Sequence, residues 1–222
     1  MKNHYINPLP IRLSIQYSHY ICRTNYTQMN YLETERLILR PFAEQDAESL
    51  FIILSNVEVN AFLPMFPLKD IEEAKTYLHE KHTAINSGKT LFYYAICLKD
   101  NNIPIGYIHI SGGDSYDLGY GLRKEFWHKG ICSEACRVVI EKLKHIEIPY
   151  ITATHDVNNP RSGRVMQAIG MKYRYSYNEL WQPKNKWVTF RVYQLNLDGQ
   201  ENRIYKKYWN KYPIHFVETI PK

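Results

Sequence analysis

The sequence predicts a mixed α/β fold in which a mostly antiparallel, twisted sheet is flanked by helices. Short β-rich runs alternate with longer helical ones from Glu35 onward, as in mixed folds and unlike bundles or sandwiches. Two β-rich runs, 91–98 and 103–110, are separated only by the polar turn 99–102, which favours an antiparallel hairpin. The 222 residues, 45% of them hydrophobic, suffice for one sizeable core but are few for two.

One strand and two helices are expected before this hairpin. Residues 36–41 (RLILRP) indicate a strand that ends at its proline, and residues 46–54 form a helical apolar stripe. Residues 70–86 indicate a second helix, because Asp70 suits the N-cap, Glu73 the capping-box position and Gly88 the residue just past the end.

The elements after the hairpin begin with a third strand, 116–122, followed by a helix over 131–145. Residues 149–154 (PYITAT) form a β-branched run that suits a buried strand. Pro160 opens a helix that runs to Ala168 and stops at Gly170. Two more strands are expected from MKYRYSY and KWVTFRVYQLNL.

Three segments divide the chain: an extension over 1–28, the main domain over 29–198 and a basic aromatic tail over 199–222. Two interpretations of residues 1–28 stay open, a segment that docks on the domain or an upstream stretch preceding a true start at Met29. In the tail, aromatic side chains recur at helical spacing, which favours an amphipathic helix packed on the domain; they are Tyr205, Tyr208, Trp209 and Tyr212.

Composition limits the compartment and the ligands. The formal net charge of +6 favours anionic ligands such as a phosphorylated cofactor, RNA or an acidic peptide without selecting one. The four cysteines show no paired secretory framework, no apolar run is long enough to span a membrane, and Pro8 and Pro10 interrupt the N-terminal stretch. We therefore expect a cytoplasmic protein without a membrane partner.

A strand, a basic turn and a helix start follow one another in YDLGYGLRKEFWHKGICSEA. This order builds phosphate sites, because turn amides and the positive end of a helix converge on one anion. Gly130 permits the close approach, Lys129 adds a cation and Ser133 adds a hydroxyl. A second polar turn, Asn158–Ser162, follows the next strand.

Four pieces in this order resemble the GNAT superfamily of N-acetyltransferases, in particular its ribosomal-protein N-terminal acetyltransferase branch. They are LETERLILRPF, DLGYGL, FWHKGICSEA and NPRSGRVMQAIGM, and the resemblance spans about Tyr31 to Leu197. Departures are Cys132 where the family has Gly or Ala, Trp127 where Gln or Arg is frequent, and Met171 in place of Phe.

The resemblance implies an enzyme that binds acetyl-CoA and passes the acetyl group to a primary amine by direct attack. The diphosphate would be held by the turn and the helix start, through Trp127, His128, Lys129, Gly130, Ile131, Cys132 and Ser133. The pantetheine arm would pair as an added strand with the backbone of Gly121, Leu122 and Arg123.

Catalytic roles are implied for three residues. Asp117 matches the strand carboxylate that serves as general base, although it is shorter than the usual Glu, and His155 is an alternative base. Ser162 matches the donor of a proton to the leaving thiolate. Asn159 matches an amide that binds pantetheine or orients the amine, with an N-cap as the alternative. Arg161 is placed to reach a CoA phosphate.

Alternatives of other classes stay open. The chain would be a non-catalytic acyl-CoA sensor if Asp117 and Ser162 do no chemistry, or an RNA- or ribosome-binding module that uses the basic aromatic tail. A metal site at His128, Cys132 and Cys136 lacks a fourth ligand, so no metal is expected. The acceptor amine, which Leu63–Pro67 is expected to help select, is left open, as is the choice between monomer and homodimer.

Overall fold

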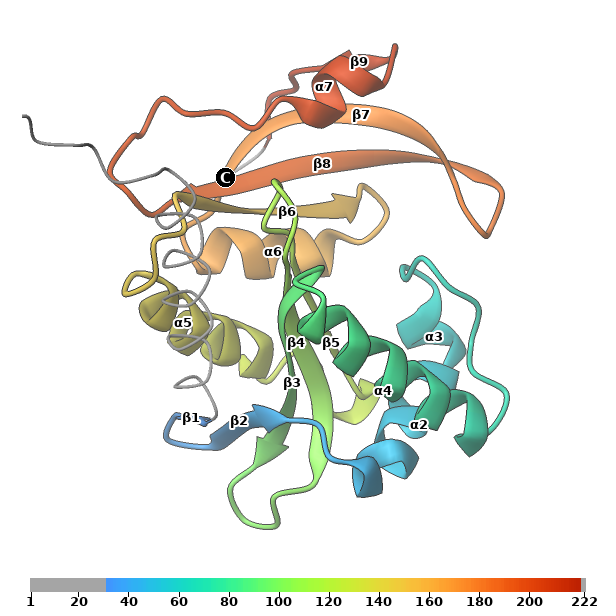
Figure 1. The fold of residues 1–222 in the computed structure, drawn as a ribbon. Helices are drawn as coiled ribbons and strands as arrows, with labels where there is room; N and C mark the ends of the chain where they lie inside the picture. Colours follow the sequence, from blue (N-terminus) through green and yellow to red (C-terminus); the bar gives the residue numbers. More distant parts are fainter. Residues whose placement is uncertain (1–30, 221–222) are drawn as a thin grey trace, which may run out of the picture. The chain divides into compact units, whose positions relative to one another are not determined.

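The computed structural model describes residues 31–220 of the chain (Figure 1). The predicted extension over 1–28 and the proposed start at Met29 lie outside these residues. None of the helices within 31–220 has the length and apolar character needed to cross a membrane.

Five antiparallel strands form the first sheet, in the order in which the chain makes them. They are β1 (Leu32–Glu33), β2 (Leu37–Pro41), β3 (Thr90–Leu98), β4 (Pro104–Ser111) and β5 (Leu118–Leu122). The predicted hairpin is confirmed, since Tyr93 lies opposite His109 across β3 and β4.

Helices α2 and α4 cover one face of this sheet, and α5 lies on the other (Figure 1). The covering elements are η1 (Glu44–Asp46), α2 (Ala47–Ser55), α3 (Val57–Asn60) and α4 (Ile71–Asn86). Leu50, Leu54 and Leu78 are buried there against the sheet. Asp70 caps α4 by accepting from the Glu73 amide at 2.8 Å. The Glu73 carboxylate accepts from the Lys69 amide, one residue before the position that the capping box predicts.

The second sheet has the strand order β6, β8, β7, β9 and is antiparallel throughout. Its strands are β6 (Tyr150–Asp156), β7 (Lys172–Trp181), β8 (Lys186–Asn196) and β9 (His215–Phe216). The chain reaches β6 through η2 (Lys124–Phe126) and α5 (Ile131–Leu143), and α6 (Pro160–Ala168) packs on β6. The mostly antiparallel α/β class is thereby confirmed.

The two sheets meet at one point. Strands β5 and β6 run parallel, joined by a bridge between Asp117 and Thr152 and by the Thr152 amide, which donates to the Tyr116 carbonyl at 3.3 Å. Beyond that bridge no ladder joins them within the described residues. The backbone edges of both strands therefore border an opening.

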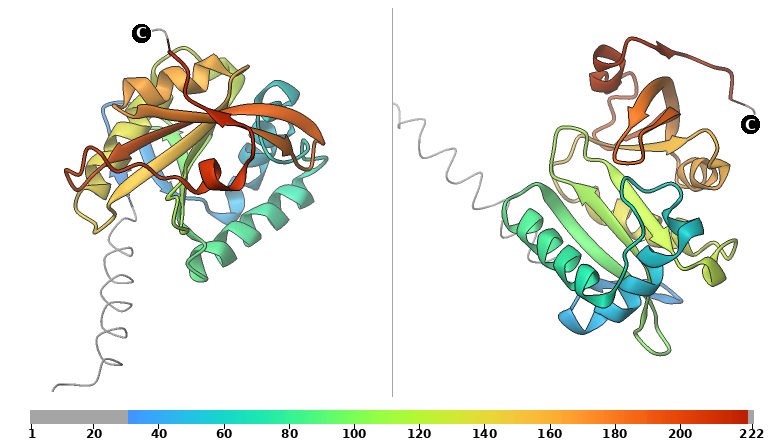
Figure 2. Two further views of the ribbon diagram at one scale, coloured as in Figure 1. Left: turned by 90° about the horizontal axis from the view of Figure 1, so that it is seen from above. Right: turned by 90° about the vertical axis from the view of Figure 1, so that its right-hand side faces the viewer.

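The C-terminal segment forms a short helix, α7 (Lys207–Lys211), and strand β9, which pairs with β7 (Figure 2). Tyr208, Trp209 and Tyr212 pack against the aromatic cluster of β7 and β8. The helix is shorter than the aromatic spacing predicts. Tyr205 lies before it, because its amide is bonded to the Gln194 side chain and its carbonyl to the Tyr175 hydroxyl, which hold the backbone out of a helix.

Candidate active site

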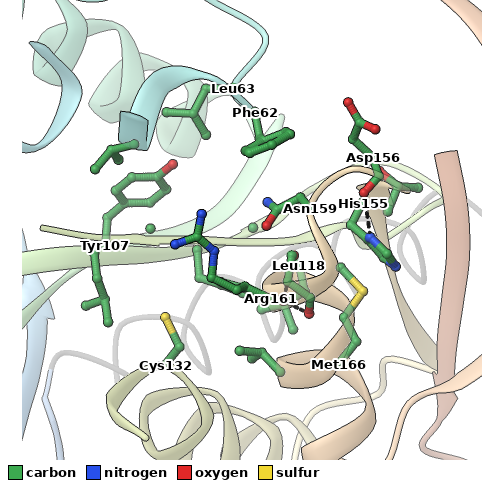
Figure 3. A pocket seen from close by; sticks show the side chains of 18 of the residues that line it. Phe62, Leu63, Tyr107, Leu118, Cys132, His155, Asp156, Asn159, Arg161 and Met166 are labelled. Atoms are coloured by element: carbon green, nitrogen blue, oxygen red, sulfur yellow. Dashed lines mark hydrogen bonds between the residues drawn. The ribbon is translucent and has the colours of Figure 1, made fainter. Parts of the chain in front are cut away.

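A cavity of about 730 Å³ occupies the opening between β5 and β6. Its walls come from both strands, the turn before α5, the first turns of α6 and the segment between α3 and α4 (Figure 3). Most of the predicted site residues line it; they are Asp117, Gly121, Leu122, Trp127, His128, Gly130, Ile131, Cys132, Ser133, Asn159 and Ser162. Arg123 and Lys129 do not: Arg123 pairs with Glu125, and the Lys129 ammonium lies over the Phe126 ring.

Two glycines of β5 make room for rings on β4. A Cβ on Gly119 would lie 2.1 Å from the His109 ring, and one on Gly121 would lie 2.6 Å from the Tyr107 ring. Both rings therefore lie across β5 and form part of the cavity wall. The glycines of the DLGYGL strand thus shape the cavity from the neighbouring strand, which the sequence motif does not reveal.

The register of β4 and β5 decides which backbone groups face the opening. The Ser111 amide donates to the Asp117 carbonyl and the Arg123 amide to the Ile105 carbonyl, so odd-numbered residues of β5 bond to β4. The expectation that Gly121 and Arg123 pair with pantetheine through their backbone is therefore wrong. The edge toward the cavity is formed by Leu118, Tyr120 and Leu122, and the Leu122 carbonyl already accepts from Trp127 Nε1 at 3.0 Å.

The turn before α5 has the geometry of an anion site. His128 and Gly130 both adopt left-handed backbone conformations, with φ of 62° and 73°. Gly130 is the N-cap, so the amides of the first turn, Ile131 to Ser133, have no acceptor within the helix. These amides and the positive helix end suit a diphosphate. Burial raises the pKa of the Cys132 thiol to about 12, so a neutral side chain stands beside them.

This turn is supported by a salt bridge that the sequence analysis did not predict. Arg36 of the β1–β2 connection pairs with Glu134 in the first turn of α5, with Nε 2.9 Å from Oε2. The same guanidinium donates to the Lys129 carbonyl at 3.2 Å. Two segments far apart in sequence thereby fix the start of α5.

The first turn of α6 presents three polar side chains to the cavity. Asn159 is the N-cap residue of α6, but its side chain makes no cap bond, so its backbone takes the predicted N-cap position while its carboxamide does not bond to the helix. The Arg161 guanidinium lies 4.4 Å above the Trp127 ring and spans part of the cavity (Figure 3). Ser162 Oγ lies 3.0 Å from the hydroxyl of Tyr120, which also donates to the Ser162 carbonyl at 2.9 Å. The sequence interpretation missed Tyr120, although it stands in the same motif as Asp117.

Asp117 is the carboxyl with the most strongly altered acidity in the cavity. Burial raises its pKa to about 7, against the opposing effect of a hydrogen bond from Thr152. Its Oδ1 atom is buried and has no hydrogen-bond partner. Near neutral pH this carboxyl is half ionised, which suits a general base.

His155 is less well placed for that role. Strand alternation directs its side chain to the face opposite Thr152 and Asp117, where a Cβ on Gly163 would lie 2.7 Å from Nε2. Nδ1 lies 2.8 Å from the Asp156 carbonyl (Figure 3), and Nε2 is buried with no hydrogen-bond partner. Burial lowers the pKa of the imidazole. The alternative base thus packs against α6.

Aromatic and apolar side chains dominate the wall beyond Asp117. The segment before α4 contributes Leu63, Pro64 and Met65, as expected, whereas Phe66 is 61% exposed and does not line the cavity. Further lining residues are Phe62, Tyr77, Lys81, Tyr177, Glu179, Trp181 and Phe190. Lys184 Nζ donates to Asn60 Oδ1 at 3.0 Å and ties the β7–β8 turn to α3. Within residues 31–220 no three His, Cys, Asp or Glu side chains gather as metal ligands.

Residues 36–172 match the family model described as the acetyltransferase (GNAT) domain. The chain belongs to the GNAT acetyltransferase family. The predicted family and enzyme class, an acetyl-CoA-dependent acetyltransferase, are thereby confirmed.

Similar GNAT proteins cover most of this chain. A Bacillus subtilis protein named uncharacterized N-acetyltransferase YnaD is 26% identical over 169 residues, which are 74% of this chain and 96% of that protein. The structure of RimL, a ribosomal L7/L12 α-N-protein acetyltransferase in complex with coenzyme A, has a TM-score of 0.68 at 17% identity and covers 77% of this chain and 99% of its own. The ribosomal-protein-S5-alanine acetyltransferase of Vibrio fischeri has a TM-score of 0.64 at 20% identity, with coverages of 77% and 98%.

Proposed function

We propose that this GNAT enzyme transfers the acetyl group of acetyl-CoA to a primary amine, with protein N-termini as the first class of acceptor to test. One observation carries the proposal: Asp117, a carboxyl with a pKa near neutrality, and the Ser162–Tyr120 hydroxyl pair line the same cavity as the anion-binding turn. The similarity to enzymes that modify ribosomal-protein N-termini supports the choice of acceptor.

The residues of the turn and of α6 fit the cofactor. First-turn amides of Ile131, Cys132 and Ser133 would hold the diphosphate, and the exposed edge of β5 at Tyr120 and Leu122 would pair with the pantetheine amides. The carboxamide of Asn159 is available to the same arm. Bound acetyl-CoA supplies the activated thioester.

The proposed step moves two protons and exchanges one bond. The carboxylate of Asp117 takes a proton from the ammonium form of the acceptor, directly or through a water, and so supplies the neutral amine. The amine nitrogen forms a bond to the thioester carbonyl carbon, and the carbon–sulfur bond breaks. Ser162 Oγ gives its proton to the departing thiolate, and the second proton of the acceptor nitrogen, lost as the amide forms, returns to Ser162 through the Tyr120 hydroxyl. The products are the acetylated amine, free CoA and one proton.

The test combines binding and turnover in one sample. Acetyl-CoA affinity is measured by calorimetry, and thiol release is followed with peptides that begin with serine or alanine and with small amines. We expect amine-dependent thiol release that falls about 100-fold in Ser162→Ala, the low end of general-acid effects, with acetyl-CoA affinity retained. Ser87→Ala, at the exposed end of α4, is the matched control.

Two outcomes contradict the proposal. Acetyl-CoA binding without thiol release across a broad panel of amines would favour the non-catalytic sensor. Turnover that is equal in Ser162→Ala and wild type would remove Ser162 from the role of proton donor.

A further inference from the structure

The C-terminal segment, residues 199–220, contacts the loop that leads into Asp117, although it lies beyond the residues that match the family model. The Asp114 carboxylate accepts from the Tyr205 hydroxyl at 3.0 Å and from Lys207 Nζ at 2.9 Å. The Tyr150 hydroxyl donates to the Asp114 carbonyl at 2.6 Å. Three side chains therefore hold a residue that stands three positions before the proposed base.

This loop is bonded in turn to Asp117. The Asp117 amide donates to Ser111 Oγ at 2.7 Å, and Ser111 Oγ lies 3.4 Å from Ser115 Oγ. Thr152 Oγ1 donates to the Ser115 carbonyl at 2.8 Å. Displacement of Asp114 would therefore be passed to the backbone of Asp117.

One ring of the C-terminal segment stacks on a ring of the cavity wall. Tyr177 of β7, which lines the cavity, stacks on Tyr208 of α7 with centroids 5.1 Å apart and planes at 20°. Burial raises the pKa of both phenols, and the negative charge of Asp117 adds to the rise in each. Tyr208 thus stands behind Tyr177 within the electrostatic range of Asp117.

We propose that the C-terminal segment is a working part of the active site: Tyr205 and Lys207 hold the 111–117 loop, and Tyr208 backs Tyr177 to keep water away from Asp117. These are positioning residues that act through Asp117. The inference rests on the proposed function, because it assigns Asp117 the role of base.

The groups around Asp117 explain why water exclusion matters. Thr152 of β6 is its bridge partner, and the charge of Asp117 acts on the phenols of Tyr177 on β7, Tyr208 on α7 and Tyr120 on its own strand. His109 of β4 lies on the same face of the sheet, and burial and the charge of Lys81 lower its pKa to about 4, so it is neutral near pH 7. Burial is the cause that raises the pKa of Asp117, and no cation is among the causes that oppose it. Admission of water would lower that pKa.

The experiment compares two tyrosines of α7 and its C-cap that stack on the same ring. Tyr208→Ala removes the ring near Asp117. Tyr212→Ala removes a second ring stacked on Tyr177, with centroids 4.7 Å apart, whose electrostatic neighbours are Glu179 and Lys211 rather than Asp117. The pH dependence of kcat/KM for one amine is measured in the full chain, together with a ¹³C NMR titration of the aspartate carboxyls. Asp117→Asn identifies the Asp117 signal in that titration.

We expect Tyr208→Ala to move the acidic limb of the profile and the Asp117 titration to lower pH by about one unit or more. Lys207→Met should shift the acidic limb and the Asp117 titration in the same direction but by less. Tyr212→Ala should leave the acidic limb and the Asp117 titration at their wild-type positions. Thermal unfolding and acetyl-CoA calorimetry report whether each variant is folded.

Wild-type titration of Asp117 in folded Tyr208→Ala would overturn the inference while leaving acetyl transfer intact, as would an equal shift in both tyrosine variants. Absence of amine-dependent thiol release in the wild type would instead defeat the proposed function. In that case the ¹³C titration, which needs no turnover, still decides whether Tyr208 keeps water from Asp117.

Discussion

The two ends of the cavity are built in different ways. The proposed cofactor end is made by two short stretches that line the cavity, the turn into α5 and the first turn of α6, and the amides of the turn into α5 converge through local geometry. The proposed acceptor end combines Asp117 beside β5, Tyr177 of β7 and Phe62 from the segment between α3 and α4. The proposed diphosphate site can thus be predicted from contiguous sequence, whereas the proposed acceptor wall forms only when the two sheets pack together.

The sharpest way to test the acceptor end is Asp117→Asn, which keeps the shape of the side chain and removes the proton acceptor. We expect kcat/KM for the amine to fall about 10²- to 10⁴-fold, with the acetyl-CoA affinity unchanged by calorimetry. An equal loss of cofactor affinity would show that Asp117 supports the whole cavity rather than the acceptor end.

The same carboxyl should make folding depend on pH. Its folded pKa of about 7 lies above the unfolded value near 3.9, so the folded state binds more protons between these limits. Its contribution is therefore complete below about pH 4 and is lost as the pH rises through about 7, by an amount on the order of 2–4 kcal/mol. Urea unfolding of wild type and Asp117→Asn at pH 4.5 and pH 8 measures the difference. If the difference in unfolding free energy between the two proteins does not change with pH, the raised pKa of the buried Asp117 carboxyl is contradicted.

The ring-on-glycine packing of the acceptor end predicts a stability effect. Gly119→Ala would place its Cβ against the His109 ring and should destabilise the fold by about 1–3 kcal/mol in urea unfolding. Gly113→Ala is the matched control, since nothing lies within 4 Å of its added Cβ. Equal stability of the two variants would mean that the His109 ring is not held across β5.

At the cofactor end, Gly130→Ala tests the local geometry alone. Its φ of 73° should cost alanine about 1–2 kcal/mol, although an added Cβ would lie at an ordinary contact distance of 3.9 Å from Arg36 Nη2. We expect acetyl-CoA affinity to fall about tenfold while the pH profile of turnover keeps its position. A changed pH profile with normal affinity would reverse the assignment of the two ends.

Elements that depend on neighbouring residues could be predicted from the sequence. The hairpin, the Asp70 cap and the start of α6 at Pro160 depend on neighbouring residues, and each is found in the structure. The turn at Gly130 was recognisable for the same reason. Which edge of β5 faces the opening depends on the register with β4, so Gly121 was given a backbone role that Tyr120 and Leu122 are placed to take.

Contacts between distant segments could not be predicted from the sequence. The pairs Ser162–Tyr120, Arg36–Glu134 and Asp114–Lys207 each join residues far apart in the chain. The tail pattern indicated an amphipathic helix, but hydrogen bonds at Tyr205 shorten it. Tertiary packing decides these contacts and the length of α7, and no local sequence pattern predicts it.

Thiol release from acetyl-CoA, followed with and without a peptide amine in wild type and Asp117→Asn at pH 6 and pH 8, tests the proposed role of Asp117. We predict amine-dependent release that is faster at pH 8 in the wild type and largely lost in the variant. Release that does not depend on the amine, or that survives the loss of the carboxylate at both pH values, would contradict acetyl transfer to an amine with Asp117 as its base.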